Sequence, residues 1–169
     1  MFDASDLSGL ASGLSSDAVY AAVAVLRREC GWHIAPVWAQ TVRVDVDLQR
    51  HAPFVLMLPT LHLVSVESVT DTVTGAVITD YRKSRRGWLE RNTPWPVGAE
   101  AVEVAFTHGL SVLPGELMPI VADLATQGVN SIQGRETMGP FTFDASVRIA
   151  EYDRAMRGVV DRFRIPVFG

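Results

Sequence analysis

The sequence has one cysteine, no long apolar run and no excess of positive charge, and each of these absences excludes a class of protein. Because Cys30 is the only cysteine in 169 residues, an internal disulfide framework and a zinc site made only of cysteines are excluded. We expect Cys30 to be a small buried residue at the end of a helix. No stretch approaches the roughly 20 apolar residues that a membrane-spanning helix needs.

Composition and charge indicate a globular protein. Apolar residues make up 48% of the chain and charged residues 20%, which is typical of a chain that buries a core. The formal net charge is −4 at pH 7, whereas dedicated nucleic-acid-binding proteins usually carry a basic excess. A channel lining past which DNA slides is still compatible with this charge. The polar, acidic first residues predict no secretory signal, so we expect a cytoplasmic product.

Recognised catalytic motifs are missing as well. The chain has no glycine-rich phosphate loop, no Gly-x-Ser-x-Gly elbow and no His-Glu-x-x-His helix. Its histidines have irregular spacing beside expected strands, so packed or solvated rings are favoured over a metal site; they are His33, His51, His62 and His108. The pairs Asp45 and Asp47, and Glu100 and Glu103, favour a solvated strand face over a cation site. We therefore expect no catalytic residue, cofactor or metal.

The stretch from Leu26 to Pro36 marks the change from a helix to a β-rich region. Upstream, apolar side chains recur at helical spacing, at Val19, Val23, Leu26 and Cys30. Ser15 or Ser16 can cap the start of this helix, and Gly31 can close it in the left-handed conformation. We expect Trp32 to hold the end of the helix against a sheet.

Strands are expected between about residues 40 and 108. Alternating apolar and polar side chains predict half-buried strands at residues 40–47, 61–70 and 100–107. The apolar run at residues 52–58 predicts a strand buried on both faces.

Two hairpins are expected within this region. Residues 71–75 resemble a hairpin turn, with a returning strand at residues 76–81. The second hairpin is expected to turn at Arg86 and Gly87, with Trp88 on its return strand.

Helices are expected to follow the strands. Pro114 is suited to open a helix at about residues 116–131, and Pro119 inside this pattern predicts either a late start or a kink. Apolar spacing predicts a final helix, capped by Asp144 or Ser146 and ending before Pro166. The fold class is therefore α+β: an N-terminal helix and two C-terminal helices form a helical body, with the β-rich insertion between the first and second helices.

The expected organisation is one main domain with short ends. Residues 1–16 form a flexible arm or a short helix, residues 17–163 a single domain, and residues 164–169 an apolar tail suited to docking on another chain. Trp38, Trp88 and Trp95 lie beside prolines or charges, where an exposed aromatic often marks an interface.

The segment 82–91 is the most basic part of the chain. Its arginines are suited to bind carboxylates or phosphates of a partner. The alternative is a solvated hairpin tip whose charges discourage edge-to-edge aggregation.

The order of these segments carries a family resemblance. A helix ending in Arg-x-x-Cys-Gly-Trp-His-Ile-Ala-Pro is followed by β segments, a Thr-His-Gly turn and a Leu-Pro-initiated helix. This order resembles the head-to-tail adaptor (connector) proteins of tailed phages of the siphophage type, which are especially common in phages of actinobacteria. The matching segments, which cover most of the chain, are Arg27–Pro36, Phe54–Val69, Tyr81–Arg91, Val102–Pro114, Met138–Phe141 and Asp161–Arg164. Pro119 departs from the family pattern.

The resemblance implies a structural virion protein without enzymatic activity. Such a protein forms a dodecameric ring beneath the portal, continues the DNA channel, and presents a platform for a stopper or tail terminator protein. Genomic double-stranded DNA passes through without sequence-specific binding, and no membrane is involved. The protein belongs to the virion neck, and to the host cytoplasm during assembly.

The resemblance also implies where the contacts lie. In the family the helices form the body, with Cys30, Trp32 and Phe163 expected in its core, and the β insertion projects from it. The expected portal or neighbour contact consists of Arg164, Ile165, Pro166, Val167, Phe168 and Gly169. The expected subunit interface consists of Arg82, Lys83, Arg85, Arg86, Trp88 and Arg91.

Two other functions remain open on the sequence. A small cytoplasmic enzyme would need a pocket in which titratable groups converge. A DNA-binding module using residues 82–91 would bind duplex DNA with a strong dependence on salt.

Overall fold

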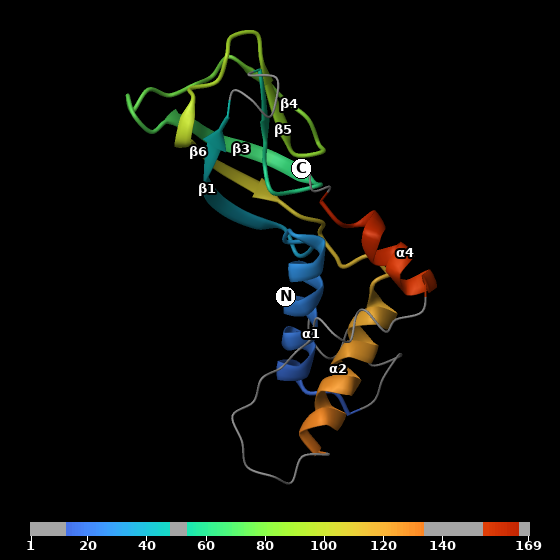
Figure 1. Cartoon of the computed structure of the whole chain (residues 1–169). Coiled ribbons are helices and arrows are strands. Elements are labelled where there is room, and N and C mark those ends of the chain that lie inside the picture. Colours follow the sequence, from blue (N-terminus) through green and yellow to red (C-terminus); the bar gives the residue numbers. More distant parts are fainter. Residues whose placement is uncertain (1–12, 48–53, 134–153, 166–169) are drawn as a thin grey trace. The chain divides into compact units, whose positions relative to one another are not determined.

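The structure is a computed structural model that describes residues 13–47, 54–133 and 154–165 (Figure 1). The chain divides into two compact units. The helical unit combines the chain up to Trp32 with the chain from Val112 onward, and the β unit is His33–Ser111. The described residues contain three helices and two three-stranded antiparallel sheets, so the mixed α and β composition that the sequence predicts is confirmed.

Helix α1 spans Ser16–Cys30 and is bounded as its sequence predicts. The hydroxyl of Ser15 accepts the N–H of Ala18 at 3.2 Å, which satisfies one of the free donors of the first turn. At the other end Gly31 has a φ of 78°, and its N–H donates to the carbonyl of Arg27 at 2.9 Å. The face buried in the helical unit is formed by Val19, Ala22, Val23, Leu26 and Cys30.

Helix α2 spans Met118–Gln133 and begins late. Pro114 opens a single turn, in which the N–H of Leu117 donates to the Pro114 carbonyl at 2.9 Å. Pro119 is the second residue of α2, where the missing N–H of a proline has no partner to lose. Of the two expectations for Pro119, the structure shows the late start and not the kink.

Helix α4 spans Arg154–Arg162 and is tied to α1 through the residues that follow it. The indole N–H of Trp32 donates to the carbonyl of Phe163 at 2.7 Å, and the N–H of Ile165 donates to the carbonyl of Cys30 at 2.9 Å. The hydrogen bond of Trp32 therefore reaches the segment after α4, where the sequence suggested a sheet. The expected caps Asp144 and Ser146 lie outside the described residues.

The first sheet has the order β1-β6-β3, and all its pairs are antiparallel. Its strands are β1 (Trp38–Val46), β3 (Leu63–Asp71) and β6 (Gly98–His108). In β6 the side chains of Val102, Val104 and Phe106 point into a core shared with the second sheet. The three alternating segments of the sequence are thus confirmed as strands.

The second sheet has the order β2-β5-β4. Its strands are β2 (Val55–Met57), β4 (Tyr81–Lys83) and β5 (Trp88–Arg91). The hairpin that turns at Arg86 and Gly87 is confirmed, since β4 pairs with β5. The prediction of a strand buried on both faces at residues 52–58 is wrong, because β2 is an edge strand in which only Leu56 is fully buried.

The returning strand expected at residues 76–81 is absent from the described β unit. The Asp71 carboxylate accepts the N–H groups of Val73 and Thr74 and so forms the expected turn. Only one bridge, Thr70 to Val77, follows this turn. The chain then leaves β3, and the carboxylate of Asp80 contacts Arg91 of β5 at 2.8 Å. The Asp80 side chain thus contacts the second sheet, and the chain does not extend the first sheet here.

In the described part of the chain no helix is both long and apolar enough to span a membrane.

Candidate interaction surface

The turn between β4 and β5 is held firmly by its neighbours in the β unit. Gly87 has a φ of 85°, and a Cβ placed on it would lie 2.1 Å from the carbonyl oxygen of Thr60. Its carbonyl accepts the N–H of Leu58 at 2.7 Å, and the carbonyl of Arg85 accepts the N–H of Leu63 at 2.8 Å. The backbone of residues 85–87 is therefore bound on two sides, which leaves the side chains of Arg85 and Arg86 exposed to solvent.

Two of the cations in the segment 82–91 are neutralised within the chain. Arg82 pairs with Glu90 across the hairpin, with 3.3 Å between nitrogen and oxygen. Arg91 pairs with Asp80 at 2.8 Å, and its side chain is only 13% exposed. The guanidinium of Arg91 also lies 5.0 Å from the centre of the Trp95 ring. The hydrogen bond from Arg91 lowers the pKa of Asp80. This ion pair therefore stabilises the hairpin of its own chain.

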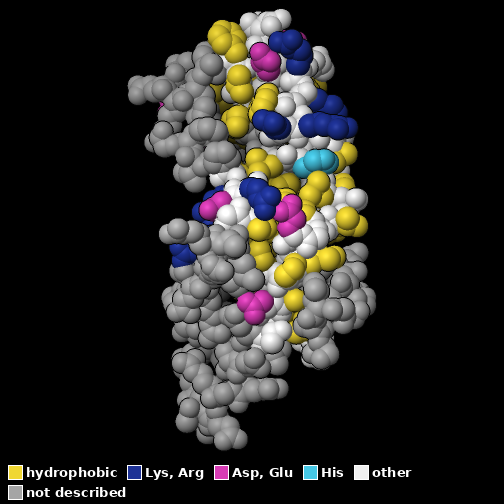
Figure 2. Space-filling view, turned by 90° about the vertical axis from the view of Figure 1, so that its right-hand side faces the viewer, with side chains coloured by type: hydrophobic (Ala, Val, Ile, Leu, Met, Phe, Trp, Pro, Cys, Tyr) yellow, Lys and Arg dark blue, Asp and Glu magenta, His cyan; other side chains and the backbone are white. Residues whose placement is uncertain are grey.

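The other three cations lie at the tip of the hairpin. Arg85 and Arg86 have no ion pair with any residue that the structure describes. The ammonium of Lys83 contacts only the carbonyl of Val64, at 3.4 Å. Figure 2 shows Lys and Arg side chains gathered beside a histidine on this face of the molecule. The basic character that the sequence assigns to the whole segment is thus concentrated in three side chains.

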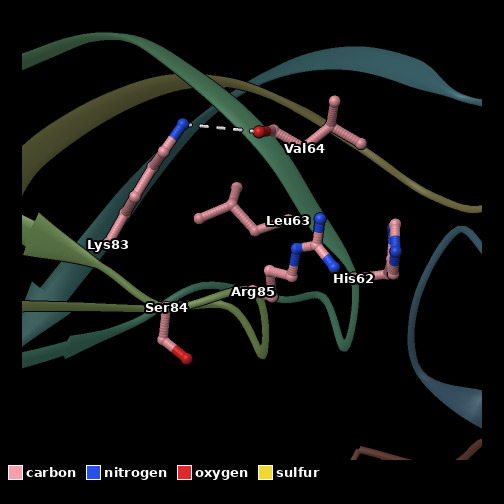
Figure 3. Close-up of a pocket in the computed structure, with 6 residues that line it drawn as sticks. All are labelled: His62, Leu63, Val64, Lys83, Ser84 and Arg85. Atoms are coloured by element: carbon pink, nitrogen blue, oxygen red, sulfur yellow. Dashed lines mark hydrogen bonds between the residues drawn. The ribbon is translucent and has the colours of Figure 1, made fainter.

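Two of these cations, Lys83 and Arg85, line an open hollow of about 340 Å³ at the start of β3. Its lining consists of His62, Leu63, Val64, Lys83, Ser84 and Arg85 (Figure 3). We call this feature, together with Arg86, the basic hollow. The hydroxyl of Ser84 accepts the N–H of Arg86 at 3.2 Å and points away from His62 in Figure 3. These two side chains therefore do not form the nucleophile and base that hydrolysis would need.

Carboxylates gather at the other end of the first sheet, around Arg43. Arg43 lies 3.0 Å from Glu103 and 3.6 Å from Glu100. The N–H of Glu100 donates to the carboxylate of Asp45 at 2.6 Å, which supports the left-handed φ of 49° at Glu100. Two carboxylates thus pair with one cation, and the Asp45 carboxylate lies beside them on the backbone of Glu100. We call this group the acidic end.

The histidines are packed side chains in the described part of the β unit. His108 is fully buried, with its ring 5.7 Å from that of His33 and 4.9 Å from that of Phe106. Burial, with a contribution from His33, lowers the pKa of His108 to about 4. The ring of His62 shares a hydrogen bond with the carbonyl of Gly109 at 3.0 Å. Among the described residues no three His, Cys, Asp or Glu side chains are grouped as metal ligands would be, and His51 lies outside this part of the chain.

The predicted docking tail begins at a fixed point in the helical unit. Arg164 donates to the carbonyl of Glu29 at 3.1 Å and pairs with Asp161 at 3.2 Å. Its first two residues, Arg164 and Ile165, are therefore bound to their own chain. The remaining residues of the predicted contact, 166–169, lie outside the described structure, so the docking role of the tail stays a prediction.

The expected core and interface aromatics differ in their surroundings. Cys30 and Trp32 are buried as predicted, while Phe163 is only partly buried. Trp95 is 1% exposed, so the suggestion that it marks an interface is wrong. Trp38 is 57% exposed, as expected for an interface residue. Trp88 is partly buried opposite Met57 of β2.

Comparison with known proteins shows a fold and not a family. No protein-family model and no curated protein matches the chain. A chain in the solved structure of the virion of a native gene transfer agent particle superimposes with a TM-score of 0.60 at 16% identity, covering 98% of this chain and 90% of the other. A chain in the neck of an empty gene transfer agent particle, with sixfold symmetry, gives a TM-score of 0.58 at 17% identity, covering 100% and 86%.

Proposed function

We propose that this protein is a structural subunit of the neck of a tailed virion. The observation that carries the proposal is the extent of the structural likeness, which covers 98% or more of this chain and at least 86% of each neighbour. A match of this extent includes both the helical unit and the β unit. The two neighbours belong to the virion and to the neck of gene transfer agent particles. The sequence resemblance to head-to-tail adaptors rests on the order of the sequence segments, and it indicates the same class of virion neck proteins.

In this role the protein forms a dodecameric ring that joins the portal to a stopper or tail terminator protein. Such a ring contains a sixfold axis, which agrees with the symmetry of the neck of the neighbour. The contacts that close a ring are heterologous, so each copy offers two different surfaces. Genomic double-stranded DNA passes through the channel without sequence-specific binding, and the net charge of −4 keeps that binding weak.

The proposed mechanism is assembly and not turnover. The segment from Arg164 to Gly169 contacts the portal or a neighbouring copy, starting from the point that Arg164 and Ile165 occupy beside α1. Many modest contacts repeated around a ring hold the neck together through avidity. The protein is made in the host cytoplasm and ends in the virion.

Mass photometry tests this function. The purified protein is measured alone and after mixing with the portal ring of the same particle. We expect a discrete species whose mass equals the portal ring plus a ring of this protein. A variant that lacks residues 164–169 is expected to lose the species while keeping its circular dichroism spectrum. If the full-length protein stays monomeric alone and with the portal, the proposal is refuted.

A further inference from the structure

The basic hollow carries positive charge that no described residue of its own chain neutralises. Lys83, Arg85 and Arg86 lie at the tip of the hairpin, while Arg82 and Arg91 are occupied by Glu90 and Asp80. No acidic residue lines the hollow. The turn is fixed by the close approach of Gly87 to Thr60 and by the two backbone hydrogen bonds of residues 85 and 87. The backbone that presents the three cations is therefore in place before any partner arrives, which lowers the cost of binding.

The acidic end of the same unit lies too far away to fill the hollow. Leu63, beside the hollow, pairs with His108 at the last residue of β6, whereas Val46 pairs with Gly98 at the first. Glu100 and His108 are eight residues apart in β6, so they are roughly 26 Å apart at about 3.3 Å per residue. Glu100 therefore cannot reach Arg85 within one chain. The exposed carboxylate of Glu67 lies nearer to the hollow, where it accepts hydrogen bonds from Ser65 and Thr107. The excess charge of the unit is therefore positive near His108 and negative toward Gly98.

We infer that the basic hollow binds the acidic end of a second copy of this chain, with Glu100 as the carboxylate nearest to Arg85 and Arg86. Two different, oppositely charged patches on one molecule are what a heterologous, head-to-tail contact requires. Glu100 is suited to this contact because it lies at the outside of the cluster, with a side chain 66% exposed and 3.6 Å from its own partner Arg43. Guanidinium groups bind carboxylates with directed, charge-assisted hydrogen bonds. This inference rests on the proposed function, in which the copies close a ring.

Nucleic acid is the competing occupant, and the composition of the hollow favours protein. Proteins that bind single-stranded nucleic acid combine a positive groove with stacked aromatics, and duplex binding depends on many phosphate contacts. The lining of the hollow contains two cations, Lys83 and Arg85, beside Leu63 and the exposed Val64, and His62 is the only ring in this lining. The acidic end, in contrast, provides a patch of opposite charge on every copy.

Charge exchange between two variants tests the inference. The first variant is Arg85→Glu with Arg86→Glu, and the second is Glu100→Arg. All three side chains are exposed, so both variants are expected to keep the fold. Circular dichroism checks this. Each variant alone is expected to weaken self-assembly by roughly 10-fold or more at about 0.1 M salt. A matched control reverses the charge of two exposed arginines of the helical unit, Arg28→Glu with Arg157→Glu. This control should assemble like the wild type.

Mixing the two variants supplies the decisive measurement. In a head-to-tail mixture the unchanged hollow of one variant meets the unchanged acidic end of the other, and the two reversed patches also match. Assembly measured by mass photometry, alone and on the portal ring, should therefore return in the mixture. It should also fall as salt rises, because exposed charges are screened.

The other outcomes separate the inference from the proposed function. If the wild type assembles and the Arg85→Glu, Arg86→Glu variant assembles equally well, the inference is wrong and the neck function stands. If each variant fails alone and the mixture does not recover, the two patches contact different partners and the inference is again wrong. If assembly survives but salt-dependent binding to duplex DNA is lost, the hollow binds phosphate instead. A wild type that never assembles overturns both proposals.

Discussion

The substitution Gly87→Ala should destabilise the protein strongly. Its effect should exceed that of a glycine-to-alanine change at any described turn of the β unit where the added methyl meets no other atom. Two costs act at this position. A left-handed φ, here 85°, costs a non-glycine residue about 1–2 kcal/mol. The new methyl would lie 2.1 Å from the Thr60 carbonyl oxygen, and moving that backbone adds about 1–3 kcal/mol as for other overpacked sites. We expect a total loss of about 2–5 kcal/mol in the free energy of unfolding.

Gly75→Ala is the matched control, because it carries the first cost without the second. Gly75 has a φ of 71° and no atom within 4 Å of the added methyl, so its loss should stay at about 1–2 kcal/mol. Urea denaturation followed by circular dichroism measures both values from the transition midpoints. Equal losses for the two variants would refute the argument that contact with Thr60 holds the turn. Gly87→Ala should also weaken assembly, since the same turn presents Arg85 and Arg86.

Three further predictions concern buried and capping groups. Burial raises the pKa of the Cys30 thiol to about 11, so the folded protein should react with a thiol reagent at pH 8 far more slowly than the denatured chain; equal rates would contradict the buried position of Cys30. The pKa of His108 is lowered to about 4, with a usual value near 6.5, so the unfolded chain takes up the proton first. The stabilising contribution of neutral His108 is then complete above pH 6.5 and is lost as pH falls toward 4. Urea midpoints at pH 7 and pH 5 should therefore differ more in the wild type than in His108→Phe, and an unchanged difference would show that another group is responsible. Finally, Ser15→Ala removes the cap of α1 and should lower stability by about 1 kcal/mol, while Ser16→Ala, one residue inside the helix, should change it little.

The features predicted well from the sequence depend on local chemistry. The start and end of α1 follow from Ser15 and Gly31, which act on backbone groups within four residues. The hairpin at residues 84–87 follows from a glycine in a polar tip between apolar segments. Pro119 shows the limit of this reasoning, because a proline in a helical pattern is compatible with either a late start or a kink, and the turn opened by Pro114 decides between them.

The features predicted poorly depend on partners distant in the chain. The run at residues 52–58 is apolar enough for a central strand, but β2 pairs only with β5 and therefore lies at an edge. Trp95 has prolines on both sides, yet it is buried with its indole N–H on the carbonyl of Phe54, 41 residues away. The sequence alone contains no signal for either pairing.

The candidate surface illustrates the same limit in terms of charge. The segment 82–91 is recognisably basic from its composition, but composition does not say which cations are free. That depends on the register of the hairpin, which places Arg82 opposite Glu90, and on the path after β3, which brings Asp80 to Arg91. Likewise Glu100 and Glu103 resemble a solvated strand face in the sequence. The pairing of β1 with β6 places both of them beside Arg43, and it places the Asp45 carboxylate on the N–H of Glu100.

Register thereby divides the charges of the β unit into two kinds. Paired charges such as those of Arg91 and Asp80 stabilise the hairpin, and they neutralise each other within the chain. The charges that are left in excess are positive beside Leu63, where Arg85 has no ion pair with a described residue, and negative toward Gly98, where Arg43 is the partner of both Glu100 and Glu103. A chain with a net charge of −4 would repel its own copies if its charges were evenly spread. Segregating the signs along one strand converts that repulsion into attraction in a single, head-to-tail orientation, which is the orientation that a ring requires.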